Sequence, residues 1–257
     1  MPLEKRVSNL TKKVLLIIVE GQTEQIILED YLDEYFANST IRFDVQHEDI
    51  LTKWDANKRI PNIKNSVVRV IQSYLDKYKF LAKDLTAVVH ITDADGCFIA
   101  PDFVKVKEDI EQNLYYTEDA IFVKSEKRKK QIEQRNEMKA NNAKILVAND
   151  HFNIQRLKIP YQLFYFSTNL EHVLWNERNE VATEKVQKAD EFMENLSGSI
   201  EEYLKEFLPV SPDLMYKEKM KESWSFLMAG CNSLRRGTNV PLLFEMIKSD
   251  VGTKSQS

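Results

Sequence analysis

The hydrophobic pattern of the chain contains two segments that predict buried strands. The first is a run of six consecutive apolar residues, Val14–Val19, and the second is Thr86–Thr92 (TAVVHIT). Short apolar runs of this kind predict strands that are covered on both faces of a sheet. The first run ends directly at Glu20-Gly21, and the second ends at Asp93-Ala94-Asp95-Gly96.

Amphipathic segments separate these two strands. Apolar residues recur at helical spacing in Gln25–Phe36 and in Asn62–Phe80, whereas Ile41–Gln46 alternates apolar and polar residues as a strand does. Thr23 fits the N-cap of the first helix. The resulting order β-α-β-α-β favours a parallel sheet with right-handed crossovers.

Beyond Pro101 the pattern predicts shorter elements. The predicted strands are 120–123, 145–148 and 161–166, and the predicted helices are 103–114, 170–177, 183–196, 200–207, 216–228 and 240–247. We expect residues 47–60 to be irregular and the tail 252–257 to be disordered. The sequence therefore predicts an α/β core over 1–167 with a basic helical insertion near 124–144, and a helical C-terminal lobe over 168–257 that completes the core.

The composition is that of a globular protein. Of the 257 residues, 43% are hydrophobic and 30% are charged. No apolar run approaches the roughly 20 residues that cross a bilayer, and residues 1–12 form a polar lead-in without a signal-peptide core. Cys97 and Cys231 are far apart and show no metal-ligand spacing. We therefore expect reduced thiols in a cytoplasmic protein without a membrane partner.

The charge pattern contains one strongly basic segment. The formal net charge of −4 argues against a basic coat over the whole protein, but residues 124–144 carry eight Lys or Arg against three acids. Such a run is typical either of a solvated helix face or of a non-specific, salt-dependent contact with phosphates. Under the second interpretation, the candidate nucleic-acid contacts are Lys124, Lys127, Arg128 and Lys130.

The acids that follow the two buried strands are candidates for a metal site. Adjacent parallel strands lie about 4.8 Å apart, so carboxylates at neighbouring strand ends can share one hard cation. Asp93 and Asp95 are expected to point the same way, because side chains alternate along an extended segment. Among hard cations, Mg²⁺ suits a few carboxylates combined with waters and phosphate oxygens.

The two motifs, VEGQTE at 19–24 and DADG at 93–96, resemble those of the Toprim domain of topoisomerases, primases and OLD-family nucleases. This resemblance implies a Rossmann-like parallel sheet flanked by helices. It also implies that Glu20 acts as general acid and base in phosphoryl transfer, while Asp93 and Asp95 hold Mg²⁺ or Mn²⁺. Glu24 matches a further acid of the motif and is implied as an additional metal ligand.

A later segment, FYFSTNLEHVLW at 164–175, is similar to a segment of RloB-like abortive-infection proteins, which are Toprim-like proteins of bacterial antiphage defence. The similarity implies that Glu171, beside Asn169, is a further metal ligand at the same sheet edge. It also implies a metal-dependent nuclease acting on RNA, such as tRNA, or on DNA. A separate ATPase or sensor protein is implied as a partner, since the chain has no GxxxxGK[ST] motif.

Other interpretations of the same residues stay open at this point. The segment Asp93–Gly96 is also typical of a turn, because Asp and Gly favour turns. One alternative is a catalytically inert module that binds nucleic acid or a partner protein through its basic helix and helical lobe. A further alternative is a Mg²⁺-dependent phosphatase or nucleotide hydrolase that uses the same acids on a small substrate. The choice between RNA and DNA, the number of metal ions and the formation of oligomers are also left open.

Overall fold

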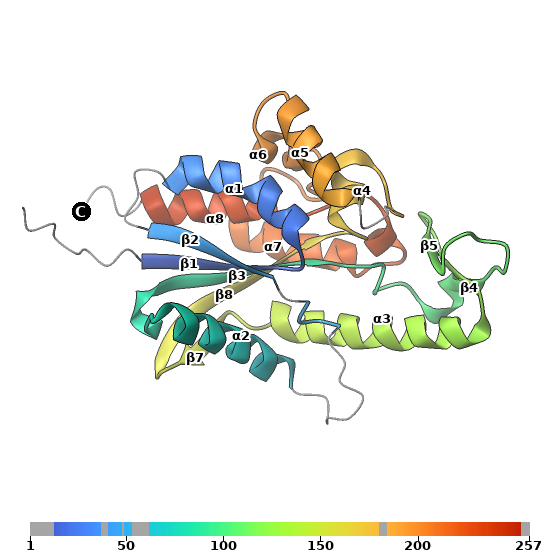
Figure 1. The fold of residues 1–257 in the computed structure, drawn as a ribbon, viewed down its shortest axis with the longest axis horizontal. Helices are drawn as coiled ribbons and strands as arrows, with labels where there is room; N and C mark the ends of the chain where they lie inside the picture. The colour runs from blue at the N-terminus through green and yellow to red at the C-terminus, as the bar shows by residue number, and fades with distance from the viewer. Residues whose placement is uncertain (1–12, 37–40, 48, 53–61, 180–183, 253–257) are drawn as a thin grey trace, which may run out of the picture.

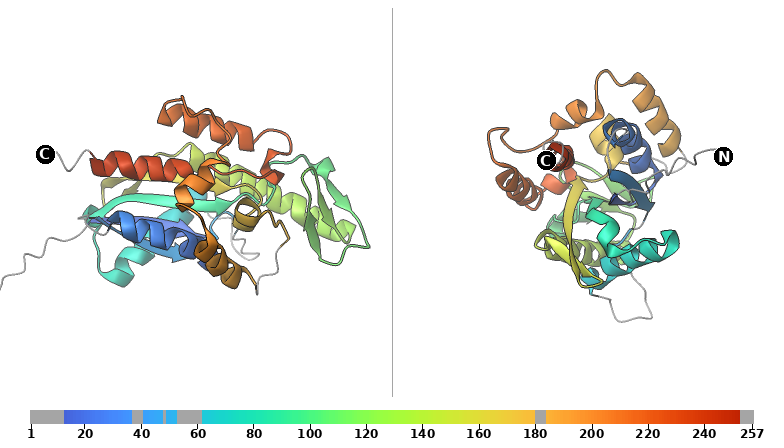
Figure 2. Two further views of the ribbon diagram at one scale, coloured as in Figure 1. Left: turned by 90° about the horizontal axis from the view of Figure 1, so that it is seen from above. Right: turned by 90° about the vertical axis from the view of Figure 1, so that its left-hand side faces the viewer.

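The protein forms a mixed α/β fold in which a mostly parallel central sheet lies between two layers of helices (Figures 1 and 2). The computed structural model describes residues 13–36, 41–47, 49–52, 62–179 and 184–252. The strand order is β2-β1-β3-β8-β7. Strands β2, β1, β3 and β8 pair in parallel, and the edge strand β7 pairs antiparallel with β8.

The parallel strands end together at one edge of the sheet. The strands are β1 (Lys13–Val19), β2 (Ile41–His47), β3 (Leu85–Asp93), β7 (His151–Ile154) and β8 (Leu157–Phe166). The register aligns Ile18 of β1 with His90 of β3, and Asp93 of β3 with Phe166 of β8. The acids that follow β1 and β3 are therefore delivered to the same edge.

Helices cover both faces of the sheet. The longer helices are α1 (Gln22–Phe36), α2 (Ile63–Tyr78), α3 (Glu126–Val147), α5 (Lys185–Asn195), α7 (Tyr216–Leu227) and α8 (Pro241–Gly252). Figure 1 shows α1, α7 and α8 on one face and α2 and α3 on the other. Two short helices, α4 (Leu170–Trp175) and α6 (Ile200–Lys205), lie on the α1 side.

Hydrophobic burial explains why the two strongest sequence patterns form these elements. The apolar residues of β1, from Val14 to Val19, are at most 4% exposed because helices cover both faces of the strand. In α2, a stripe at helical spacing that includes Ile63, Val67 and Ile71 faces the core. The side chain of Asn62 caps this helix by accepting a hydrogen bond from the Lys64 N–H.

A second, smaller sheet projects from the central one. It consists of β4 (Val104–Val106), β6 (Ile121–Val123) and β5 (Leu114–Tyr116) in the order β4-β6-β5. Its apolar side chains form a separate cluster with Ile132 of α3 and with Leu234. Figure 1 shows this sheet beside the N-terminal end of α3, beyond the edge where the parallel strands end.

The structure confirms the prediction of a parallel sheet flanked by helices and corrects several details. The predicted helix over 103–114 is wrong, because this stretch contains β4 and then leads to β5 of the small sheet. The predicted strand 145–148 is wrong because these residues form the end of α3 and its C-cap. The strand β7 was not predicted. Thr23 is not an N-cap, since α1 already begins at Gln22.

The C-terminal helices share the main core with the sheet. Leu204, Leu227 and Phe244 belong to the same cluster of buried side chains as β1 and β3. The division of the chain near residue 167 stays a prediction. The predicted lead-in 1–12, most of the predicted irregular stretch 47–60 and nearly all of the predicted tail lie outside the described residues.

None of the helices in the described part of the chain combines the length and apolar character needed to cross a bilayer. The most apolar elements are instead the central strands, which the two helical layers cover.

One buried carboxylate joins three helices of the α1 side. Glu201 of α6 is 6% exposed, accepts a hydrogen bond from Tyr31 of α1 at 2.6 Å, and pairs with Lys248 of α8 at 2.6 Å. Lys205, one turn later on α6, lies 2.7 Å away. Although burial alone raises the pKa of Glu201, hydrogen bonds from Lys205, Lys248 and Tyr31 lower it to about 2.

We expect Glu201→Gln to lower the free energy of unfolding at pH 7 by about 1–3 kcal/mol, because the amide loses charge-assisted hydrogen bonds. The pKa of Glu201 is lower in the folded protein, so this stabilisation is present above the unfolded pKa near 4.5 and is lost as the pH falls toward 2. Urea unfolding at pH 7 and pH 3 measures both effects. The control is Glu206→Gln, which changes an exposed glutamate at the C-cap of α6. An equal loss in both variants at pH 7 would contradict the prediction.

Candidate functional site

Glu20 lies at the point where β1 ends and is bonded to the end of β3. Its Oε1 accepts hydrogen bonds from the Thr92 hydroxyl at 2.5 Å and from the Asp93 N–H at 3.2 Å. Because β1 and β3 are adjacent parallel strands, the acid that follows one strand is within reach of the last residues of the other. The structure therefore brings the first motif and the second motif together.

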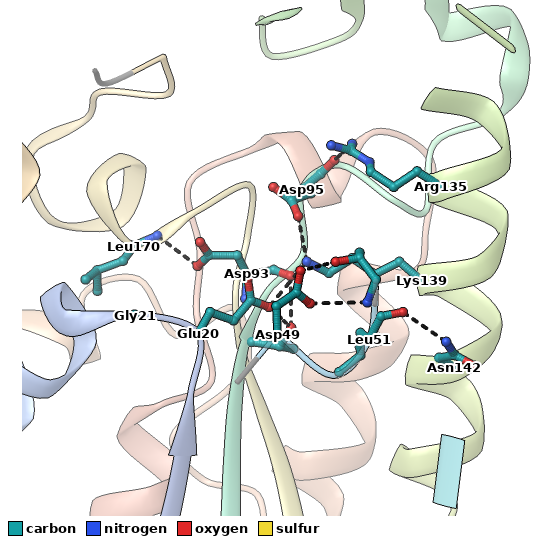
Figure 3. Close-up of polar contacts among 12 residues, drawn as sticks. Glu20, Gly21, Asp49, Leu51, Asp93, Asp95, Arg135, Lys139, Asn142 and Leu170 are labelled. Carbon is teal, nitrogen blue, oxygen red and sulfur yellow. Dashed lines mark hydrogen bonds and ion pairs between the residues drawn. The ribbon is translucent and has the colours of Figure 1, made fainter. Parts of the chain in front are cut away.

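The two aspartates of the second motif point to different neighbours, as Figure 3 shows. The Oδ1 of Asp93 accepts a hydrogen bond from the Leu170 N–H at the start of α4, at 3.1 Å. Asp95 turns toward α3 instead. The expectation that both side chains point the same way is wrong, because β3 ends at Asp93 and Asp95 has a left-handed backbone with φ of +51°.

The turn after β3 is held by backbone hydrogen bonds to the segment that follows β8. The Ala94 N–H donates to the Phe166 carbonyl at 2.8 Å, and the Asp95 N–H donates to the Thr168 carbonyl at 2.7 Å. Thr168 also has a positive φ, of +56°. Left-handed conformations are unfavourable for residues with side chains and often occur at functional sites.

A lysine from α3 lies between two of the carboxylates (Figure 3). The Lys139 ammonium is 2.6 Å from Asp95 Oδ2 and 3.3 Å from Glu20 Oε1. The Lys139 side chain is 1% exposed, whereas those of Glu20 and Asp95 are 17% and 26% exposed. The ammonium therefore approaches the carboxylates from inside the protein, and the carboxylates face outward.

Arg135, one helical turn before Lys139, also connects α3 to the turn after β3. Its guanidinium donates to the Asp95 carbonyl at 3.0 Å and to the Tyr116 hydroxyl at 3.0 Å. Residues four apart lie on one face of a helix, so Arg135 and Lys139 act on the same turn of chain. Three residues further on, the Asn142 amide donates to the Leu51 carbonyl at 2.9 Å.

The loop held by Asn142 carries a further acid. Asp49 is exposed, and its carboxylate accepts hydrogen bonds from the backbone N–H and hydroxyl of Thr52. Figure 3 shows Asp49 near Glu20 and Lys139. Its negative charge raises the pKa of both of these groups, which places it in the electrostatic environment of the site.

Two more acids lie on the Asp93 side of the edge. Glu24, in the first turn of α1, accepts a hydrogen bond from the Gly21 N–H at 3.1 Å and is 6% exposed. Glu171 is 2% exposed and its Oε1 pairs with Lys185 at 2.8 Å. The other oxygen, Oε2, is buried and has no hydrogen-bond partner among the described residues.

Burial and crowding shift the pKa of these groups upward. Burial raises the pKa of Glu20 to about 7, Lys139 opposes the shift, and Asp95 and Asp49 add to it. Burial also raises the pKa of Asp93 well above its usual range, and the charges of Glu20, Glu24 and other nearby acids raise it further. Burial is the main cause of both shifts, and the neighbouring carboxylates add to each of them.

The pKa of Asp95 moves the other way. Burial alone would raise it, but the positive charges of Lys139 and Arg135 lower it below its usual value. For Lys139, burial opposes the charged form, but Asp95, Glu20 and Asp49 raise the pKa well above its usual value. Lys139 is therefore a permanent positive charge that keeps Asp95 ionised.

The donor chemistry of the five predicted acids fits a hard divalent cation, since they are carboxylates with an excess of negative charge and Glu171 has a buried oxygen without a partner. The distances fit less well. Within the described ranges, no group of three or more His, Cys, Asp or Glu side chains lies close enough together to hold a metal ion. The cation found between Glu20 and Asp95 is the ammonium of Lys139.

The predicted nucleic-acid contacts lie away from these acids. Lys124 lies one residue before the N-cap of α3, which is Ser125. Lys127, Arg128 and Lys130 lie in the first two turns of the helix, where Lys127 and Lys130 are exposed. Arg128 and Lys139 are separated by about 16 Å along α3, from a rise of 1.5 Å per residue. The structure therefore places these cations on the same helix as Lys139 but not at the carboxylates.

Sequence reasoning missed Lys139, Arg135, Lys185 and Asp49 as members of the site. A signal for Lys139 exists in the sequence, because it falls in the stripe Ile132, Asn136, Lys139, Ala143 and Leu146, which is spaced as a buried helix face. A lysine in the middle of such a stripe needs a buried partner of opposite charge.

Comparisons of the chain with protein-family models, with curated proteins and with solved structures give no significant match. Any functional conclusion therefore depends on the motifs and on the geometry of this edge.

Gly96 allows a test of whether the turn after β3 requires a residue without a side chain. Its φ is +65°, and a Cβ placed there would lie 2.4 Å from Leu234 Cδ2. We expect Gly96→Ala to lower the free energy of unfolding by about 1–2 kcal/mol for the left-handed backbone alone, and by more because of the overlap. The measurement is urea unfolding.

The control for this prediction is Gly230→Ala. Gly230 has a similar φ of +55°, but nothing lies within 4 Å of its Cβ position. The difference between the two variants isolates the contact with Leu234. Equal destabilisation would show that close packing against the turn is not what requires Gly96.

Proposed function

We propose that the chain is a Toprim-like, divalent-metal-dependent nuclease that cleaves phosphodiester bonds in RNA or DNA. The observation that carries this proposal is the meeting of Glu20 with the Asp93–Gly96 turn at one edge of a parallel sheet. Open α/β sheets bind their ligands at this edge. The proposed role as an effector of bacterial antiphage defence has only the motif resemblance as support.

Glu20 is suited to move protons during cleavage. General acids and bases work best when their pKa is near the operating pH, and the pKa of Glu20 is raised to about 7. The Thr92 hydroxyl and the Asp93 N–H orient its carboxylate, and its side chain remains 17% exposed. In the proposed reaction, Glu20 accepts a proton from the attacking nucleophile or gives one to the leaving oxygen.

The neighbouring acids are the proposed ligands of Mg²⁺ or Mn²⁺. When bound, the metal polarises the phosphate and stabilises the leaving oxygen. Asp93, with Glu24 and Glu171 nearby, carries the negative charge that is least neutralised by basic side chains. The cations Lys139 and Arg135 add positive charge beside the place where a phosphate would bind.

The first turns of α3 are the proposed contact with the nucleic-acid backbone. The N-terminal end of α3 projects beyond the sheet edge (Figure 1). It carries Lys127, Arg128 and Lys130, and Lys124 lies just before it. A contact made by such side chains is electrostatic and does not depend on sequence. In this proposal, the contact holds one part of a nucleic-acid strand on α3, and the neighbouring part of the strand lies at the carboxylates.

One observation favours the alternative of a catalytically inert module. Lys139 already pairs with Glu20 and Asp95, and the described residues form no group of three metal-ligating side chains. Such a module would bind nucleic acid or a partner protein, such as an ATPase of the same defence system, without cutting.

The first experiment measures cleavage of labelled tRNA, single-stranded DNA and duplex DNA with Mg²⁺ or Mn²⁺. We expect metal-dependent cutting that falls by at least about 100-fold in Glu20→Ala, because the group that transfers the proton is lost. A similar loss is expected in Asp93→Ala. The control is Asp76→Ala, which removes an exposed acid from α2.

Circular dichroism spectra and melting temperatures establish that all three variants are folded. Tight binding without cutting under any metal supports the inert module. Cutting that survives both Glu20→Ala and Asp93→Ala would exclude this edge as the active site.

The contact on α3 is tested by charge reversal. We expect Lys127→Glu/Lys130→Glu to weaken binding of a labelled oligonucleotide and to reduce the slope of log Kd against log salt by about two, since two phosphate contacts are lost. Fluorescence anisotropy at several salt concentrations gives both quantities. Lys217→Glu/Lys221→Glu on α7 makes the same charge change at exposed positions elsewhere, and an equal effect of both pairs would contradict a specific role of α3.

A further inference from the structure

Lys139 takes a position that the sequence motifs assign to a metal ion. Its ammonium is 2.6 Å from Asp95 and 3.3 Å from Glu20, so one positive charge is shared by the acids of the two motifs. The expectation from the motifs was that Asp93 and Asp95 share a metal ion. In the structure, these two aspartates have different partners.

The position of Lys139 is fixed by the fold around it. It belongs to the buried stripe of α3 and is 1% exposed, so its stem is packed along its whole length. A buried ammonium is costly unless it is paired, and here the pairing is with two carboxylates. Arg135 holds the same turn through the Asp95 carbonyl, which keeps Asp95 directed toward α3.

The acids on the other side of the edge are neutralised less completely. Asp93 accepts a backbone N–H from Leu170, and Glu24 accepts one from Gly21. Lys185 pairs with one oxygen of Glu171, while the second oxygen is buried without a partner among the described residues. A buried carboxylate oxygen without a partner needs a bound ion or an ordered water at that place, and the neighbouring carboxylates favour a cation.

We propose that Lys139 acts as a built-in cation at the Glu20–Asp95 pair, so that this pair takes up no divalent ion while Lys139 is present. Any divalent ion then binds on the side of Asp93, Glu24 and Glu171, and Asp95 is not a metal ligand. This second part rests on the proposed function, whereas the first part does not. The site is consequently a one-metal site with a lysine in place of a second cation.

The test counts the Mn²⁺ ions bound per chain by equilibrium dialysis and by the loss of the free Mn²⁺ signal in electron paramagnetic resonance. We expect Lys139→Met to bind one Mn²⁺ more than the wild type, because the freed carboxylates need a cation. The extra ion should be lost again in Lys139→Met/Asp95→Asn, and Lys139→Arg should not gain it.

Lys219→Met is the matched control. By the same substitution it removes an ammonium from Glu245 of α8, which is not part of the site, and the count of bound ions should stay that of the wild type. An unchanged count in folded Lys139→Met, or an extra ion that persists after Asp95→Asn, would overturn the proposal.

A second variant decides the case if Lys139→Met does not fold. We expect Asp95→Asn alone to keep the Mn²⁺ affinity of the wild type, and Asp93→Asn to weaken it by at least about 10-fold, as is usual when groups at a metal site are removed. Equal weakening by both would make Asp95 a ligand and overturn the proposal.

The same counts separate this proposal from the proposed function. A wild type that binds no Mn²⁺, together with a Lys139→Met variant that binds one, contradicts metal-dependent cleavage and supports the role of Lys139. A wild type that binds Mn²⁺ and cuts nucleic acid, with an unchanged count in folded Lys139→Met, supports metal-dependent cleavage and contradicts the role of Lys139.

Discussion

The site depends on one electrostatic constraint, which is the neutralisation of carboxylates crowded at the end of the parallel sheet. Lys139 supplies part of this neutralisation from inside the protein, through its contacts with Glu20 and Asp95. The free energy of a buried ion pair is a balance, because desolvation of both charges opposes their attraction. Removing one partner costs more than the pair contributes, since a buried charge is then left without compensation.

The fold creates this crowding through ordinary features of an α/β sheet. Parallel strands end at one edge, so acids that directly follow β1 and β3 must meet there. The backbone after β3 then turns sharply, and the left-handed Asp95 separates its own carboxylate from that of Asp93. One acid is directed to the start of α4 and the other to α3, which divides the negative charge into two parts.

Much of this arrangement could be predicted from the sequence, because its main elements have strong local signals. The apolar runs of β1 and β3 and the amphipathic stripe of α2 are such signals, and the acids after the strands follow from them. The helix predicted over 103–114 failed because β4 and β5 have only three residues each and are stabilised by pairing with β6. Strands this short carry no periodicity of their own.

The role of Lys139 could not be predicted for a related reason. Seven basic residues in one helix indicate a solvated face. The apolar spacing around Lys139 indicates that it is buried, but only the packing of α3 on the sheet shows which carboxylates it pairs with. The direction of Asp95 likewise depends on the Thr168 carbonyl, which is 73 residues away in the chain. Both features are set by tertiary contacts, which local patterns do not encode.

Helix α3 carries both the basic residues that contact the site and the exposed basic residues of its first turns. Arg135 and Lys139 fix α3 against the Asp93–Gly96 turn, and the exposed cations of its first turns are part of the same continuous helix. Arg128 and Lys139 are about 16 Å apart along the helix. This distance corresponds to about five base pairs of a duplex, at 3.4 Å for each phosphate along one strand. The helix holds this separation constant. Under the proposed function, a nucleic acid bound at the exposed end would therefore pass the carboxylates at a fixed distance from its point of attachment.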